Sequence, residues 1–185
     1  DERVSSLAQS KFPFVLHGRT ECPHPYTYLD IDNQGAFYKA TNLLLDLGHE
    51  RIGLVNGCES LTFARDRQVG YAQALQLHQI TYDPNLAHSL VGMTEEGGFI
   101  AVSQMLLQRP RPTAFVVTSI IHALGALRAI RQHGLEPGRD ISLIAHDDGL
   151  PYLAADKFDP PLTTTTSIIR DAGYEVAKML HTEIE

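Results

Sequence analysis

Short apolar runs recur along the chain, separated by longer segments in which apolar residues return every three or four positions. The runs are continuous and lack the polar-apolar alternation of a half-exposed strand. Continuous runs of this length are typical of strands in a parallel sheet that is covered on both faces. The predicted strands are 12–17, 26–31, 51–56, 87–91, 113–118, 141–146 and 162–166.

The segments between these strands show helical periodicity. From Ala36 to Leu47 the apolar residues fall on one helix face. Asp32-Asn33 precedes this segment and offers side-chain oxygens to the free N–H groups of a first turn, and Gly48 follows it as a stop. The predicted helices are 36–47, 63–78, 94–107, 120–133 and 168–182.

Strands and helices alternate in units of roughly 25 to 30 residues, which is the size of βαβ repeats. This alternation predicts an α/β fold with a doubly wound parallel sheet. In such sheets ligands bind outside the carboxyl ends of the strands. The polar, charged and aromatic residues that follow the predicted strands, and that we take as candidate ligand-binding residues, are His17, Asp32, Phe63, Arg67, Ser119, His122 and Asp147.

These candidates also have plain structural interpretations. Asp32 and Ser119 could serve as helix caps and nothing more, since both residue types favour the position before a helix. Arg67 could lie on a solvated helix face, and Phe63 could be an ordinary core aromatic. Asp147 follows a fully apolar strand, so it either faces a pocket or caps the next turn.

Motifs for catalysis are absent from the sequence. It has no G-x-S-x-G elbow, no G-x-x-x-x-G-K-[ST] loop and no H-E-x-x-H. Asp147-Asp148 could form an acid/base pair, but adjacent residues past a strand usually point in different directions. His146 fits a packed residue at the core edge better than a ligand. We therefore expect no enzyme, no cofactor and no metal site.

Composition narrows the class of protein further. The 185 residues carry a formal net charge of −7, which makes the chain a poor non-specific DNA binder. No apolar run approaches the roughly 20 residues that span a bilayer, so we expect no membrane partner. Cys22 and Cys58 are far apart and form no C-x-x-C pair, which favours reduced thiols and a cytoplasmic location.

An arginine and an aspartate that face one cleft, together with hydroxyl and amide groups, suit a neutral hydroxylated ligand such as a sugar. Several segments, in this order and spacing, also resemble LacI/GalR-type bacterial transcriptional regulators. They are Asp32-Asn33, Leu47-Gly48-His49-Glu50-Arg51-Ile52-Gly53, Arg67-x-x-Gly70-Tyr71-x-x-Ala74-Leu75, Arg111-Pro112-Thr113-Ala114, and Ile141-Ser142 through Asp147-Asp148 to Pro160-Pro161-Leu162-Thr163-Thr164.

The resemblance implies roles for single residues. Arg67 occupies the position of the family's effector-binding arginine, and Asp147 that of its strand-end aspartate. Asp32 and Phe63 are implied neighbours of the pocket. Ser119 stands where many members carry Asn or Ser followed by Asp, and here Ile120 follows it. His122 is unusual at its position and is a candidate for altering the choice of ligand.

The resemblance also implies an architecture like that of type I periplasmic binding proteins, in which two lobes close on a small effector. We expect residues 33–162 to form a nearly complete C-terminal lobe, and residues 1–32 and 163–185 to form part of the N-terminal lobe. The family's DNA-binding headpiece is not in this sequence, so we expect a chain truncated at both ends.

The implied function is that of the effector-sensing core of a transcriptional regulator or repressor. Binding of a sugar or related polyol between the lobes would modulate operator affinity, through a homodimer and a headpiece outside this chain. The alternative is a periplasmic sugar-binding protein of an ABC importer.

Overall fold

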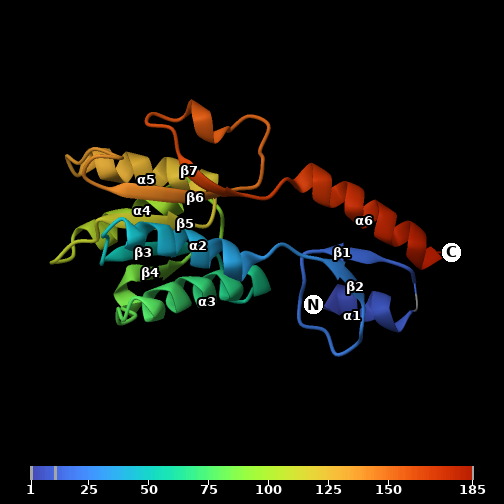
Figure 1. The fold of residues 1–185 in the computed structure, drawn as a ribbon. Coiled ribbons are helices and arrows are strands. Elements are labelled where there is room, and N and C mark those ends of the chain that lie inside the picture. The colour runs from blue at the N-terminus through green and yellow to red at the C-terminus, as the bar shows by residue number, and fades with distance from the viewer. Residues whose placement is uncertain (1, 11, 185) are drawn as a thin grey trace.

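The larger part of the chain is built on a parallel sheet of five strands (Figure 1). The computed structural model describes residues 2–10 and 12–184. Neighbouring strands run parallel, so every connection must return across the sheet, and most connections contain a helix. In their order across the sheet, the strands are β4 (Ala87–Ser89), β3 (Ile52–Asn56), β5 (Ala114–Val117), β6 (Ser142–Asp147) and β7 (Thr163–Thr166).

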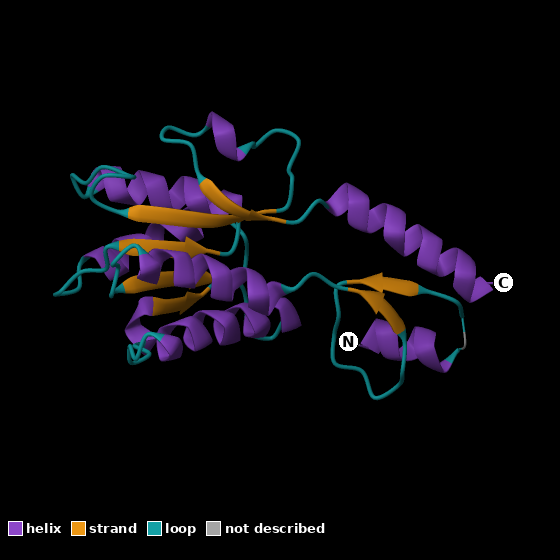
Figure 2. Ribbon diagram, viewed as in Figure 1, coloured by secondary structure: helices purple, strands orange, loops and turns teal. Residues whose placement is uncertain are grey.

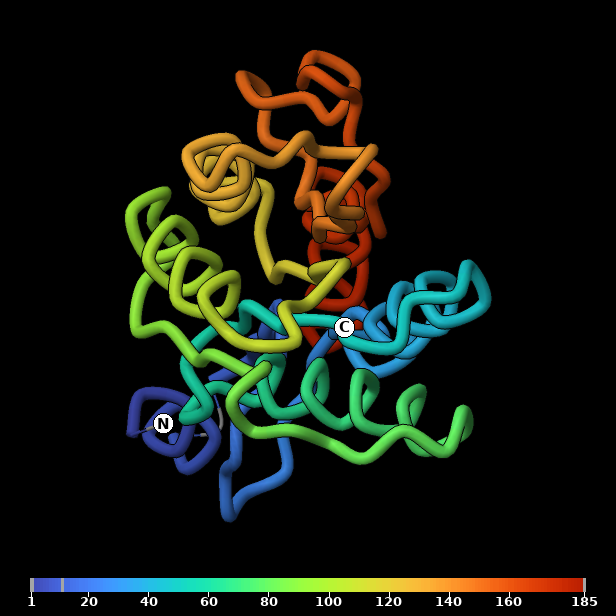
Figure 3. The backbone as a smooth tube through the Cα atoms, turned by 90° about the vertical axis from the view of Figure 1, so that its left-hand side faces the viewer, coloured from blue at the N-terminus to red at the C-terminus, as the bar shows by residue number. Residues whose placement is uncertain are grey.

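Helices cover both faces of this sheet, as the turned view in Figure 3 shows. One pair encloses a core that contains Phe37 and Tyr71, and the other pair a core that contains Met105 and Ile130. The predicted doubly wound parallel sheet is thereby confirmed. The first pair is α2 (Asn33–Asp46) with α3 (Thr62–Leu77), and the second is α4 (Glu95–Leu106) with α5 (Ile120–Gln132).

A second, smaller part lies beside the carboxyl-end edge of the large sheet (Figure 2). Strands β1 (Val15–His17) and β2 (Thr27–Leu29) pair in parallel, and α6 (Ile169–Ile184) packs on both. A short helix that the sequence pattern did not predict, α1 (Glu2–Gln9), belongs to the same part and buries Val4. Within the described ranges, no helix combines the length and apolar character needed to cross a membrane.

The boundary between the two parts differs from the prediction. We expected the smaller part to resume at residue 163, but Thr163–Thr166 is strand β7 and pairs with β6 in the larger sheet. The reason is that β-branched threonines favour an extended chain, and the open edge of β6 offers it a hydrogen-bonding partner. The connection to the smaller part therefore begins at Ser167.

The ends of α2 follow from the sequence. The Asp32 carboxylate accepts a hydrogen bond from the Gly35 N–H at 2.8 Å, which satisfies one of the free donors of the first turn. After the last turn, Gly48 takes a φ of +89°, a left-handed conformation that glycine adopts at little cost. The predicted cap and stop are both confirmed.

Glycines allow the two helices within each pair to pack closely against one another. A Cβ atom on Gly70 of α3 would overlap the Gln34 carbonyl oxygen of α2, and one on Gly125 of α5 would overlap the Glu95 carbonyl oxygen of α4. These are backbone atoms, which cannot move aside unless the helix moves. The two glycines therefore set the distance between α2 and α3 and the distance between α4 and α5. Gly70 also sets where the first turns of α2 and α3 lie.

Substituting these glycines should separate the helices. We expect Gly70→Ala and Gly125→Ala each to lower the free energy of unfolding by about 1–3 kcal/mol. Gly173 of α6 is the matched control because no atom lies within 4 Å of a Cβ built there. Gly173→Ala should be neutral or stabilise by up to about 1 kcal/mol. Urea unfolding followed by circular dichroism measures the difference, and equal effects in all three variants would contradict the close packing.

Candidate functional site

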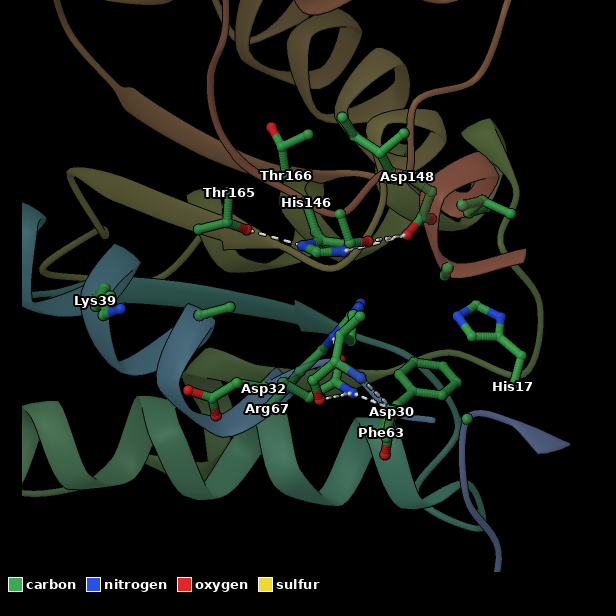
Figure 4. Close-up of a pocket in the computed structure, with 18 of the residues that line it drawn as sticks. His17, Asp30, Asp32, Lys39, Phe63, Arg67, His146, Asp148, Thr165 and Thr166 are labelled. Carbon is green, nitrogen blue, oxygen red and sulfur yellow. Dashed lines mark hydrogen bonds and ion pairs between the residues drawn. The ribbon is translucent and has the colours of Figure 1, made fainter. Parts of the chain in front are cut away.

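A cavity of about 770 Å³ lies between the carboxyl-end edge of the large sheet and the smaller part of the chain (Figure 4). The first turns of α2 and α3 form one wall, and the ends of β6 and β7 form the opposite wall. Both connections between the two parts, residues 30–32 and 167–168, line the cavity. A ligand held here would therefore touch both parts of the chain and both of the segments that join them.

Arg67, in the second turn of α3, is buried in the wall of this cavity. Only 4% of the residue is exposed. Its Nε donates to Asn33 Oδ1 at 2.8 Å, and its Nη1 donates to the carbonyl oxygen of Thr118 at 2.7 Å and to the Thr118 hydroxyl. The guanidinium carbon lies 4.9 Å from the ring centroids of both Phe37 and Phe63. The interpretation of Arg67 as a solvated surface residue is thus wrong.

The surroundings of Arg67 decide its charge. Burial lowers the pKa of the guanidinium to about 10, and the nearby carboxylates Asp148 and Asp30 oppose this shift. At neutral pH the side chain is still protonated. The cavity wall therefore holds a cation packed against two aromatic rings.

The opposite wall carries a hydrogen-bonded cluster around His146. The ring Nε2 lies 3.2 Å from Asp148 Oδ1 and 3.1 Å from Ser167 Oγ, and Nδ1 lies 2.9 Å from Thr165 Oγ1. Burial raises the pKa of Asp148, but the hydrogen bond and charge of His146 and the charge of Arg67 outweigh it, so the net shift is downward. Asp148 is therefore ionised at neutral pH.

The smaller part of the chain is also tied to α3 beside the cavity. Arg19 Nη2 lies 2.5 Å from Asp66 Oδ2, and Arg65 Nη2 lies 2.7 Å from Glu21 Oε1. The Thr62 hydroxyl donates to the Arg19 carbonyl oxygen. Each exposed pair contributes little energy, but together with this hydrogen bond the pairs link residues 19–21 to the start of α3.

The structure brings together four of the seven residues that the sequence predicted. His17, Asp32, Phe63 and Arg67 all line the cavity. Asp32 does so while its carboxylate also caps α2, which confirms the capping interpretation of that residue. Whether these residues bind a ligand stays a prediction.

Asp147 does not line the cavity, contrary to expectation. Its Oδ1 accepts from the Gly149 N–H at 2.8 Å, which is the turn-capping alternative. Asp148 lines the cavity in its place. The reason is the alternation of side chains along β6, in which Ile144 packs with α2 and α3 while Ala145 packs with α4 and α5. His146 and Asp148 continue the Ile144 face.

Ser119 and His122 also lie outside the cavity lining. The Ser119 hydroxyl accepts from the Ile121 N–H at 3.1 Å and caps α5. His122 is fully buried, and its Nε2 contacts the Gly92 carbonyl oxygen at 3.1 Å. Both residues belong to the start of α5, which covers the face of the sheet away from α2 and α3. Their position just past β5 therefore wrongly indicated that they would line the cavity.

Several cavity residues besides Asp148 were not among the sequence candidates. Asp30 and Lys39 line the wall near α2, and Ser167 lines it at the start of the second connection. Asp30 could have been found, because it lies two residues before Asp32 near the end of a predicted strand. In the parts of the chain that the structure describes, no group of three His, Cys, Asp or Glu residues is arranged to hold a metal ion.

Comparison with known proteins identifies the family. The sequence profile of the periplasmic binding protein-like domain matches residues 41–185. The chain belongs to this family. Its periplasmic-binding-protein-like sheet was expected from the resemblance, and that expectation is confirmed.

The relatives of this periplasmic binding protein-like chain are LacI-type regulators, as the resemblance implied. The HTH-type transcriptional regulator AglR of Rhizobium meliloti is 47% identical over 181 residues, which is 97% of this chain and 51% of that protein. A regulatory protein of the LacI family from Chloroflexus aggregans superposes with a TM-score of 0.89 at 31% identity, covering 97% of this chain and 63% of that one.

A third similar protein was solved with a sugar. The structure of a complex of the transcriptional regulator CelR with cellobiose has a TM-score of 0.86 and 29% identity, over 96% of this chain and 54% of that one. The chain spans about half the length of the curated relatives it matches. These relatives are regulators, not enzymes or importer components.

The geometry around Arg67 predicts that a lysine cannot replace it. Arg67→Lys keeps a positive charge but cannot donate to Asn33 and Thr118 together from a flat group between two rings. We expect the free energy of unfolding to fall by about 1–3 kcal/mol. The control is Arg170→Lys on the exposed face of α6, which should change it by less than about 0.5 kcal/mol. Thermal unfolding monitored by circular dichroism compares the two variants. An unchanged stability of Arg67→Lys would contradict the role given to the guanidinium group.

Proposed function

We propose that this chain is the effector-sensing core of a bacterial transcriptional regulator, and that its cavity binds a neutral hydroxylated effector, a sugar or related polyol. The observation that carries the proposal is the pairing of a buried cation with an ionised carboxylate across one cavity. Arg67 lies in one wall and Asp148 in the other, and the wall residues come from both parts of the chain.

The chemistry of the two walls suits hydroxyl groups. A guanidinium only donates hydrogen bonds and an ionised carboxylate only accepts them, whereas a hydroxyl does both. A sugar ring can therefore accept from Arg67 and donate to Asp148 without carrying a charge of its own. The ring of Phe63 adds an apolar face against which the C–H groups of a pyranose can pack.

The similar regulators support the same class of effector. CelR has been solved in complex with cellobiose, and a cavity of about 770 Å³ has room for a disaccharide. Because the relatives are regulators, the importer alternative has less support than the regulator.

Regulation would follow from the position of the cavity. An effector that binds one arrangement of the two parts more tightly than another shifts the population toward that arrangement. In the whole protein, we propose that this shift changes operator affinity through a homodimer and a DNA-binding headpiece outside this chain. The proposed role is binding without catalysis, in the cytoplasm where the operator lies.

Calorimetry on the full-length protein tests the effector site. Glucose, galactose, cellobiose, maltose and sucrose form the panel, and at least one should bind. Asp148→Asn should weaken that binding by roughly tenfold to over a hundredfold, since a charged hydrogen-bond partner contributes about 1.5–3 kcal/mol. Asp147→Asn is the matched control and should stay within about threefold of the wild type.

Two results would count against this proposal. If no sugar in the panel binds, the effector class is wrong. If Asp147→Asn abolishes binding while Asp148→Asn does not, the cavity carboxylate has been misassigned, and the position implied by the family resemblance would be the correct one.

A further inference from the structure

His146 has no assigned role in the effector site, although it lies in the wall of the cavity. Only 2% of it is exposed, and both ring nitrogens have partners from other segments (Figure 4). Nδ1 contacts Thr165 at the end of β7, and Nε2 contacts Ser167 and Asp148. One ring therefore joins the end of β6, the end of β7 and the connection that leads into α6.

The partners decide which nitrogen must carry a proton. An ionised carboxylate can only accept, so the contact between Nε2 and Asp148 needs a hydrogen on Nε2. The Thr165 hydroxyl can donate or accept, so it can pair with Nδ1 in the neutral or the protonated ring. The Asp148 contact is thus the one that depends on histidine as a donor.

Asp148 has few other means of keeping its orientation. It follows the last residue of β6 and lies outside the hydrogen-bonded ladder of the sheet. Besides His146, its Oδ1 is approached by the Ser167 hydroxyl at 3.4 Å, a long hydrogen bond. Both anchors act on the same oxygen, which leaves Oδ2 available to the cavity.

We propose that His146 is a positioning residue of the effector site: its Nε2–H holds one oxygen of Asp148, so that the other oxygen faces the effector. The inference rests on the proposed function, because it assigns Asp148 to the effector. His146 itself need not touch the effector, since its two nitrogens are already engaged.

The charges around Asp148 fit this role. Arg67 faces it from α3, and Asp30 from the first connection adds negative charge near Arg67. The other titratable groups of the cavity wall are His17 from β1, Asp32 just before α2, and Lys39 in α2. Without the donor on Nε2, two of the influences that lower the pKa of Asp148 would be gone, and burial would raise it.

Substituting His146 by Gln or by Asn separates the roles of its two ring nitrogens. The amide of Gln reaches about as far as Nε2, and the amide of Asn only about as far as Nδ1. His146→Gln can keep the donor to Asp148, whereas His146→Asn can keep only the contact with Thr165. Both variants lose the ring and its packing, so a purely structural role predicts similar losses in both.

The first readout is calorimetry of the full-length variants with the sugars of the panel named above. We expect His146→Gln to keep affinity within about fivefold of the wild type, and His146→Asn to lose at least about twentyfold. Equal affinities in the two variants would overturn the proposal, provided that both unfold at similar temperatures. If one variant fails to fold, His146→Phe, which keeps ring size without a donor, should match the loss expected for Asn.

The second readout does not need an effector. The side-chain carboxyl of Asp148 can be titrated by NMR in protein labelled with ¹³C-aspartate, with Asp148→Asn identifying the signal. We expect its pKa to rise most in His146→Asn and in His146→Phe, and to rise less in His146→Gln, which keeps the donor to Asp148 but loses the charge of the histidine. An unchanged pKa in all variants would overturn the positioning role. If the pKa shifts as expected but no panel sugar binds, the proposed effector class fails while the positioning of Asp148 stands.

Discussion

A guanidinium that is almost completely buried must have its donors satisfied, and this requirement at Arg67 shapes the whole site. The side chain comes from α3, but its acceptors come from Asn33 at the start of α2 and from Thr118 just past β5. Two rings, Phe37 and Phe63, pack against the guanidinium. The first turns of both helices and the edge of the sheet are thereby held in one fixed arrangement.

The same requirement links the two parts of the chain. Asn33, which accepts from Arg67, directs its amide group toward Asp30 Oδ1 at 3.4 Å, and Asp30 pairs with Arg19 at 3.2 Å. Arg19 in turn pairs with Asp66, the neighbour of Arg67. This polar network closes on itself and crosses between the parts beside the cavity. The charges of Asp148 on the opposite wall and of Asp30 partly offset the lowering of the Arg67 pKa by burial.

The sequence was informative wherever a local pattern determines structure. Continuous apolar runs located the strands, and Asp32 with Gly48 located the ends of α2, because strand burial and helix capping depend on neighbouring residues. It was uninformative for α1, whose eight residues are too few to establish a clear period. It also misplaced Thr163–Thr166, because the strand that a segment pairs with is decided by tertiary structure.

The errors in the site share one physical cause, which is that position past a strand does not say which face a residue takes. Ser119 and His122 follow β5 but start the helix that covers the opposite face. Along β6 the faces could have been derived: once Arg67 is placed on the α3 side, the residues that meet it must be those in phase with Ile144. That phase selects His146 and Asp148 and excludes Asp147. In a doubly wound sheet, alternation along the strand therefore carries more information about a pocket than distance from its end does.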